Sequence, residues 1–150
     1  MHYADYANSN RDTVKVVLEP WAIMPERAHT LDAGLDLKTP GSVCVRAHGS
    51  VTIDTGVHME IPAGYFGKLE SKSGLNVKHG VVSCGGVVDA GYTGSIVVKL
   101  YNLTDRDYWF SEGDKICQLV IIPCRTPVLE LVDSLEDTER GSNGFGSTGK

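Results

Sequence analysis

Short runs in which apolar and polar side chains alternate are the most constraining feature of this sequence. Val57, Met59 and Ile61 alternate with His58 and Glu60, and the same alternation returns over residues 96–101. Further short runs, bounded by Gly, Pro, Asp or Ser, cover residues 13–18, 42–47, 51–54 and 117–122. A period of two places every second side chain on one face of a strand. The sequence therefore predicts an all-β fold, with short strands in an antiparallel sandwich or barrel.

One short helix and one tight connection interrupt this pattern. The helix is predicted to begin at Ser73, which would cap it, with Leu75 as its anchor and Gly80 at its end. Residues 89–93 lie between two strand-like runs and predict a β-hairpin.

The chain shows no internal repeat and no sign of a second domain. Residues 1–135 are therefore predicted to form one β domain, which includes a polar N-terminal segment at residues 1–12. Residues 136–150 are rich in glycine and small polar residues, which is typical of a disordered tail. The single aromatic Phe145 favours another interpretation, in which this segment is a flexible arm that closes over a ligand.

Composition and charge exclude several classes of protein. The net charge of -5 argues against nucleic-acid binding, and no apolar run reaches the about 20 residues of a membrane helix. The polar N-terminus lacks the apolar core of a signal peptide, so we expect an intracellular protein, cytoplasmic, or also nuclear if the source is eukaryotic or viral. Four cysteines without a CxxC pair predict reduced, mostly buried thiols, and the scattered histidines predict no zinc site.

Two segments carry groups that suit phosphate. Residues 144–150 have the spacing of a P-loop, but the chain lacks the required hydroxyl residue and helix after Lys150, so a P-loop fold is rejected. Its glycines and hydroxyls, together with Arg140, remain able to wrap a phosphate. Lys72 and Ser73 place a cation and a hydroxyl at the predicted helix start, which suits an anion as well as an ordinary capped turn.

Five ordered motifs together resemble those of the trimeric dUTPases. They are AGLDL at 33–37, SGL at 73–75, GVVD at 86–89 with Tyr92 and Gly94, GDKICQL at 113–119 and RGSNGFGSTG at 140–149. The resemblance spans nearly all of residues 31–150. It implies a jelly-roll subunit, a homotrimer with active sites shared between subunits, and hydrolysis of dUTP to dUMP and pyrophosphate with Mg²⁺.

The resemblance also implies a role for individual residues. Asp89 matches the aspartate that activates the attacking water, and Tyr92 matches the tyrosine that packs under the deoxyribose and excludes a 2′-hydroxyl. The backbone of Gly86, Val87 and Val88 would pair with uracil.

The phosphate side of the implied site draws on three other motifs. Lys72, Ser73, Gly74 and Gln118 would contact phosphates, Phe145 would stack on uracil, and Arg140, Gly146, Ser147 and Thr148 would complete the site around the γ-phosphate. Magnesium would be bound through the triphosphate without a direct protein ligand. Asp36 would order the site or contact the water shell of the magnesium. Many family members have arginine where this chain has Lys72, which retains the charge without the bidentate fork.

Two alternatives share this scaffold. dCTP deaminases have a similar fold, but they carry a catalytic glutamate where this chain has Lys99, and a lysine cannot serve as a carboxylate base. They also lack the glycine-rich arm. A regulatory binding protein built on a dUTPase scaffold is the second alternative.

Overall fold

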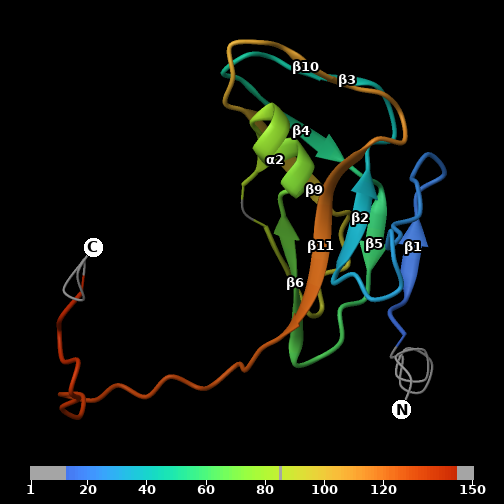
Figure 1. Cartoon of the computed structure of the whole chain (residues 1–150). Coiled ribbons are helices and arrows are strands. Elements are labelled where there is room, and N and C mark those ends of the chain that lie inside the picture. Colours follow the sequence, from blue (N-terminus) through green and yellow to red (C-terminus); the bar gives the residue numbers. More distant parts are fainter. Residues whose placement is uncertain (1–12, 85, 145–150) are drawn as a thin grey trace, which may run out of the picture.

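The computed structural model describes residues 13–84 and 86–144, and its strands form two main sheets around one core (Figure 1). The strands are β1 (Val16–Leu18), β2 (Gly34–Lys38), β3 (Val43–Val45), β4 (Ser50–Asp54), β5 (Val57–Met59), β6 (Tyr65–Glu70), β7 (Val81–Ser83), β8 (Val87–Asp89), β9 (Val97–Asn102), β10 (Tyr108–Phe110) and β11 (Lys115–Pro123). The helix α2 (Ser73–His79) lies between β6 and β7. The all-β prediction is confirmed.

The larger sheet has the strand order β2-β11-β6-β8 and is antiparallel throughout. Its longest strand, β11, lies between β2 and β6, and Leu119 pairs with Leu35 on one side and Leu69 on the other. Leu119 has no exposed surface, because this strand faces the core along its middle. The sheet brings residues from three distant parts of the sequence side by side.

The second sheet, β4-β9-β7, supplies the opposite wall of the core. Its central strand buries Val98 and Leu100 completely, while the intervening Lys99 is only partly buried and Tyr101 is exposed. Two short ladders, β1 with β5 and β3 with β10, extend the sandwich. The alternation read from the sequence is therefore the alternation between core and surface.

The helix occupies the predicted residues, but its start differs from the prediction. Lys72, in an extended conformation, is the N-cap, and no side chain caps the helix. Ser73 is already the first helical residue, and a capping side chain must belong to the residue before it. Gly80 ends the helix as predicted, with φ 61° and its N–H donated to the carbonyl of Asn76. Leu75 anchors the helix by packing against the core.

The β-hairpin predicted around residues 89–93 is wrong. A turn is present, in which the Tyr92 N–H donates to the Asp89 carbonyl at 3.1 Å. However, β8 pairs with β6, whereas β9 pairs with β4 and β7. The turn therefore carries the chain from one sheet to the other. Val88 belongs to the larger sheet and Val98 to the second sheet, and both side chains are buried in the core between the two. The two strands of a hairpin would instead lie in the same sheet.

The chain leaves the body directly after β11 and extends away from it, as the orange to red trace in Figure 1 shows. No helix or strand follows β11 up to residue 144, where the described part of the chain ends. Val128, Leu129 and Leu131 in this segment are at least 92% exposed. The separate segment thus begins well before residue 136, where the composition changes, and it carries apolar side chains that one copy of the chain does not bury.

The cysteines and the membrane prediction can also be compared with the structure. The four cysteines are free in the structure, but only Cys117 is buried, and Cys84 is exposed. The prediction of mostly buried thiols is therefore wrong, since Cys84 follows the end of the edge strand β7. Across residues 13–84 and 86–144, no helix is long and apolar enough to span a membrane.

Candidate active site

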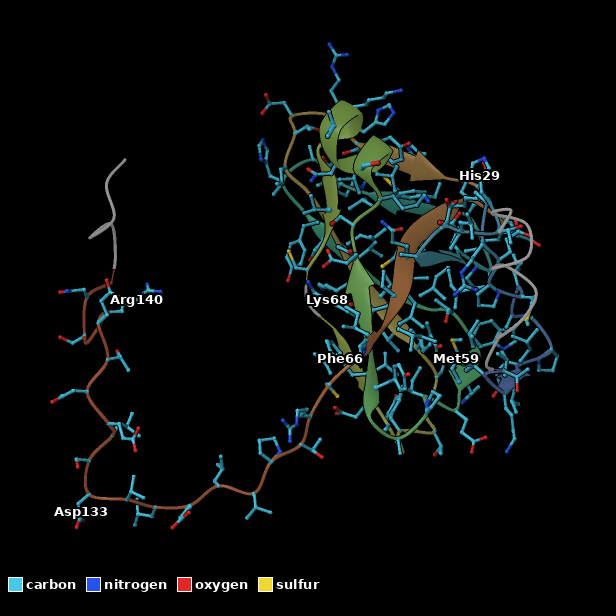
Figure 2. The ribbon with its side chains drawn as sticks, turned by 60° about the horizontal axis from the view of Figure 1, so that its bottom comes forward. His29, Met59, Phe66, Lys68, Asp133 and Arg140 are labelled. Atoms are coloured by element: carbon cyan, nitrogen blue, oxygen red, sulfur yellow. The ribbon has the colours of Figure 1, made fainter. Side chains whose placement is uncertain are left out.

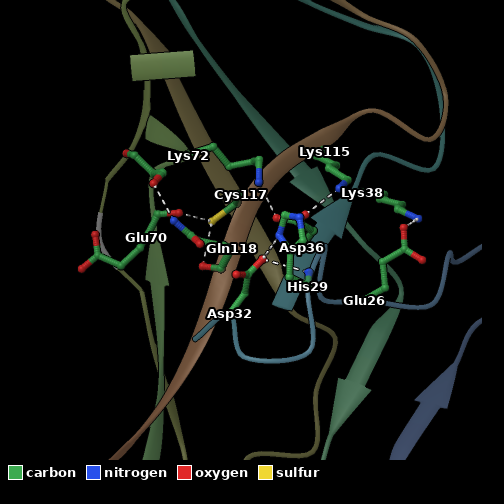
Figure 3. Close-up of polar contacts among 11 residues, drawn as sticks. Glu26, His29, Asp32, Asp36, Lys38, Glu70, Lys72, Lys115, Cys117 and Gln118 are labelled. Carbon is green, nitrogen blue, oxygen red and sulfur yellow. Dashed lines mark hydrogen bonds and ion pairs between the residues drawn. The ribbon is translucent and has the colours of Figure 1, made fainter. Parts of the chain in front are cut away.

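A buried carboxylate, Asp36, organises one group of predicted site residues (Figure 3). Its side chain is 5% exposed and lies on β2. Lys72, which follows β6, bonds Oδ1, and Lys115 of β11 lies 2.8 Å from Oδ2. A register shift in β11 between Lys115 and Cys117 accompanies this contact. Both oxygens of Asp36 are thus engaged by cations.

These contacts change the acidity of the group. Burial raises the pKa of Asp36, but the hydrogen bonds and charges of Lys115 and Lys72 outweigh it and hold the pKa below its usual value. The carboxylate in turn raises the pKa of Lys115. Asp36 is therefore a fixed anion that holds two ammonium groups in place.

Gln118 lies beside this cluster on the central strand, opposite Asp36 in β2 and Glu70 in β6. Its Nε2 donates to the carbonyl of Ser71 at 3.1 Å. The side chain also lies over Gly34, where an added Cβ would come within 2.2 Å of Gln118 Oε1. Glycine at position 34 therefore makes room for this carboxamide.

A surface groove joins these residues. It is lined by Ala28, Asp32, Ala33, Gly34, Asp36, Glu70, Lys72, Gln118 and Val120. Ser73 and Gly74 continue from Lys72 and are exposed at the start of α2. The structure thus brings the predicted phosphate-contacting residues of two motifs to one place. We refer to Asp36, Lys72, Ser73, Lys115 and Gln118 as the Asp36 group.

A second group lies on β8 and the turn that follows it. Gly86 has φ 120°, and an added Cβ would lie 2.6 Å from Leu69, so the position requires glycine. Val88 is buried, while Val87 and Asp89 face outward. The Asp89 carboxylate has no hydrogen-bond or ion-pair partner among the residues that the structure describes. Within the same residues β8 pairs with β6 alone, so it is an edge strand with free backbone groups.

Tyr92 is part of the same group and is fixed by its own turn. Its hydroxyl donates to the carbonyl of Ser95 at 3.0 Å. The ring lies across Gly94, where an added Cβ would come within 2.5 Å of the ring carbon that bears the hydroxyl. Gly94 therefore makes room for the ring, which is 46% exposed at residue level. We refer to Gly86, Val87, Val88, Asp89 and Tyr92 as the β8-turn group.

The two groups are separated within one copy of the chain. Asp89 pairs with Phe66, and Gln118 pairs with Glu70, at the two ends of β6. Four residues of a strand correspond to roughly 13 Å. Strand β6 also lies between the two groups in the sheet, so they open at different places on the surface.

The predicted arm residues lie apart from both groups. Figure 2 shows Arg140 at the far end of the extended segment, away from Phe66 and Lys68 on β6. Arg140 Nε donates to the carbonyl of Asn143 at 3.1 Å and is exposed. Phe145, Gly146, Ser147 and Thr148 lie outside the described residues.

Sequence reasoning missed Lys115 as a member of the Asp36 group. It lies in the fourth motif, three residues before Gln118. The pairing of β11 with β2 would have pointed to Lys115. However, alternation alone does not show which strands pair. Lys99 lies elsewhere, on β9, where it donates to the Thr52 hydroxyl at 3.3 Å.

The side chains that could bind a metal ion directly do not gather into one site in the described part of the chain. No group of three or more His, Cys, Asp or Glu side chains suited to a metal occurs within residues 13–84 and 86–144. Asp36 offers no free oxygen, because Lys72 and Lys115 occupy both.

A jelly-roll β fold with a polar groove beside a buried aspartate–lysine cluster, and with the Asp89 carboxylate at a sheet edge, is typical of nucleotide-hydrolysing β proteins. The model of the dUTPase family matches residues 21–149. The chain is 40% identical over 136 residues to the deoxyuridine 5'-triphosphate nucleotidohydrolase of Paramecium bursaria Chlorella virus 1, covering 91% of this chain and 96% of that protein.

Solved structures agree with this match. The dUTPase of Staphylococcus bacteriophage 80alpha with dUpNHpp is 34% identical, with a TM-score of 0.87 over 93% of this chain and all (100%) of that one. A mutant dUTPase from phage phi11 of S. aureus, described with a structural Mg(II) ion, is 34% identical with a TM-score of 0.76, covering 84% of this chain and 100% of that one. The chain belongs to the dUTPase family.

Proposed function

We propose that this chain hydrolyses dUTP to dUMP and pyrophosphate, with Asp89 as the base that activates the attacking water. The observation that carries the assignment is the outward-facing carboxylate of Asp89, without a partner among the described residues and three residues before Tyr92 on the same turn. A general base must be free to accept a proton from water beside the substrate. Of the three aspartates in the predicted motifs, Asp36 is engaged by two lysines and Asp114 accepts a hydrogen bond from the Ser111 N–H. Asp89 alone has no side-chain partner among the described residues.

Hydrolysis of a phosphoanhydride depends mainly on positioning and charge. Asp89 would take a proton from a water aligned with the α-phosphorus. The water oxygen then bonds to that phosphorus as the bond to the pyrophosphate oxygen breaks. Lys72 and Gln118, with the Ser73 amide, would hold the phosphates, and Asp36 would keep Lys72 aimed at them. Magnesium carried by the triphosphate would neutralise phosphate charge.

Recognition of the base and sugar would fall to the β8-turn group. In the segment Gly86–Val88, which would pair with uracil, the Gly86 carbonyl accepts from the Leu69 N–H at 3.0 Å. Backbone groups alternate between the two sides of a strand, so those of Val87 face the open edge of β8 and would make the pair. Tyr92, whose ring is held over Gly94, would pack under the deoxyribose and leave no room for a 2′-hydroxyl. This arrangement would favour dUTP over UTP by shape.

A homotrimer with shared sites would bring the two groups together. The separation of Asp89 from Gln118 along β6 supports this, since one copy does not present them to one small molecule. The exposed Val128, Leu129 and Leu131 also support an assembly that buries them. Arg140 and residues 145–148 would then close over the nucleotide as an arm that spans subunits. A cytoplasmic location, or a nuclear one, fits a nucleotide substrate.

Pyrophosphate release from dUTP, dCTP, dTTP and UTP, measured side by side, tests the proposal. We expect rapid release from dUTP alone. Deamination of dCTP would instead favour the deaminase alternative, and no reaction with any of the four would favour a binding protein.

A further inference from the structure

The middle of the turn that carries Tyr92 is held from outside by the side chain of His58. Upstream, Asp89 is fixed by pairing with Phe66, and downstream the Ile96 N–H bonds the Val57 carbonyl at 2.8 Å. Among the described residues, His58 supplies the side-chain hydrogen bond that reaches residues 90–94 from another element. Its Nδ1 lies 2.8 Å from the carbonyl oxygen of Thr93.

That carbonyl belongs to the peptide on which the Tyr92 ring rests. The Thr93 carbonyl and the Gly94 nitrogen share one peptide plane. The ring lies so close to Gly94 that an added Cβ would come within 2.8 Å of three atoms of the Tyr92 side chain. A bond that fixes this peptide therefore fixes the support of the ring.

The other ring nitrogen of His58 also faces an oxygen. Nε2 lies 3.3 Å from Oε1 of Glu19, which follows β1. A peptide carbonyl and a carboxylate both only accept hydrogen bonds, so each nitrogen needs a proton. Only the imidazolium form satisfies both contacts.

The charges around His58 favour that form. The Thr93 carbonyl raises the pKa of His58, burial lowers it, and Glu19 and Asp54 raise it further, with a net rise above the usual 6.5. His58 lines a second surface groove together with Lys15 and Glu60, and these two side chains pair with each other at 2.9 Å. The side chain of His58 is 24% exposed, so it stays in exchange with solvent protons.

We infer that His58 is a positioning residue for this reaction, which holds the turn beneath Tyr92 through its bond to the Thr93 carbonyl when the imidazole is charged. The inference rests on the proposed function. Because Asp89 is fixed separately by β6, loss of His58 should loosen the sugar contact while the water-activating group stays in place. A neutral imidazole can keep the proton on Nδ1, but it loses the charge that strengthens the bond to the Thr93 carbonyl. The bond is therefore strongest at low pH and weakens as pH rises through the pKa of His58.

The test compares His58→Leu and His58→Asn by steady-state kinetics with dUTP and UTP. His58→Leu should raise KM for dUTP about three- to tenfold, the worth of one hydrogen bond, with kcat within about twofold of wild type. The preference for dUTP over UTP should fall by a similar factor. His58→Asn keeps an amide donor near Nδ1 that does not titrate, so its KM should stay near the wild-type value at low pH.

The pH profile separates this role from a merely structural one. The wild-type KM should rise with pH above 6.5, and His58→Asn should abolish that rise. Glu19→Gln should move the rise to lower pH, because it removes a charge that favours the imidazolium. The control His48→Asn alters another histidine paired with a carboxylate, Asp105, at a positive-φ position that asparagine tolerates, and should leave the profile unchanged.

Wild-type KM and wild-type dUTP preference in a folded His58→Leu would overturn the inference. If that variant does not fold, an unchanged pH rise in His58→Asn would overturn it equally. A failure of the proposed function looks different, since wild type would then not cleave dUTP, or Asp89→Asn would turn over normally.

Discussion

Lys115 forms an ion pair of 2.8 Å with Oδ2 of Asp36, across two paired strands of the larger sheet. Lys72 occupies the other oxygen (Figure 3). One buried anion thus collects two cations from distant parts of the chain, and one of them, Lys72, lines the groove. Asp36 therefore holds two lysines from distant parts of the chain in fixed positions.

Asp36→Asn removes that anion without changing the size of the side chain. We expect the free energy of unfolding to fall by about 1–3 kcal/mol, because two ammonium groups lose a buried charged partner. Urea denaturation at neutral pH measures the loss. The control Glu26→Gln breaks the more exposed pair with Lys38 and should cost less than about 1 kcal/mol. Equal losses would contradict the special position of Asp36.

The Asp36→Asn variant also tests how the stability of the protein depends on pH. The folded-state pKa of Asp36 lies below its ordinary 3.8, so its stabilisation is present above the unfolded pKa and is lost as pH falls through the folded one. The stability difference between wild type and Asp36→Asn should therefore be constant near neutral pH and shrink below about pH 4. A difference that grows on acidification would show that the sign is wrong.

Asp89→Asn tests the proposed base. The amide keeps the shape of the turn residue but accepts no proton, so turnover should fall by about 10²–10⁴ or more while dUTP still binds. Single-turnover kinetics and calorimetric titration separate the two effects. Near-normal turnover would reject Asp89 as the base.

Lys72→Arg tests the departure from the arginine common in this family. A guanidinium can keep the contact with Asp36 and bind two phosphate oxygens at once, so dUTP affinity should be preserved or improved. Affinity is measured by titration in the Asp89→Asn background, where turnover is slow. A large loss would show that the space around Lys72 does not admit the larger group.

Mixing two inactive variants tests the shared site. Deletion of residues 136–150 should leave the β domain folded, because this segment has few apolar residues, but turnover should fall sharply. Co-refolding this chain with Asp89→Ala should restore about a quarter of the sites in a closed threefold ring, where arm and turn come from different copies. Verified mixed trimers without activity would show that one copy supplies both parts.

Much of the fold was readable from the sequence because burial and alternation are linked locally. Val57, Met59 and Ile61 are all buried, as their period of two predicts. The helix end at Gly80 was also readable, since its left-handed conformation favours glycine. The hairpin and the cap were predicted wrongly because each depends on a contact beyond the local pattern, namely which strand β8 pairs with and where the helical conformation begins.

The sequence by itself determined the family, the residues of the motifs and the all-β class, because these follow from residue identity and local periodicity. Only the tertiary structure decided which of those residues meet. It placed Asp36 between Lys72 and Lys115, left Asp89 at a sheet edge without a partner among the described residues, and brought His58 to the turn beneath Tyr92. Such contacts join residues far apart in the chain, and they arise from strand pairing. Alternation alone permits many pairings, and the burial of one common core selects among them.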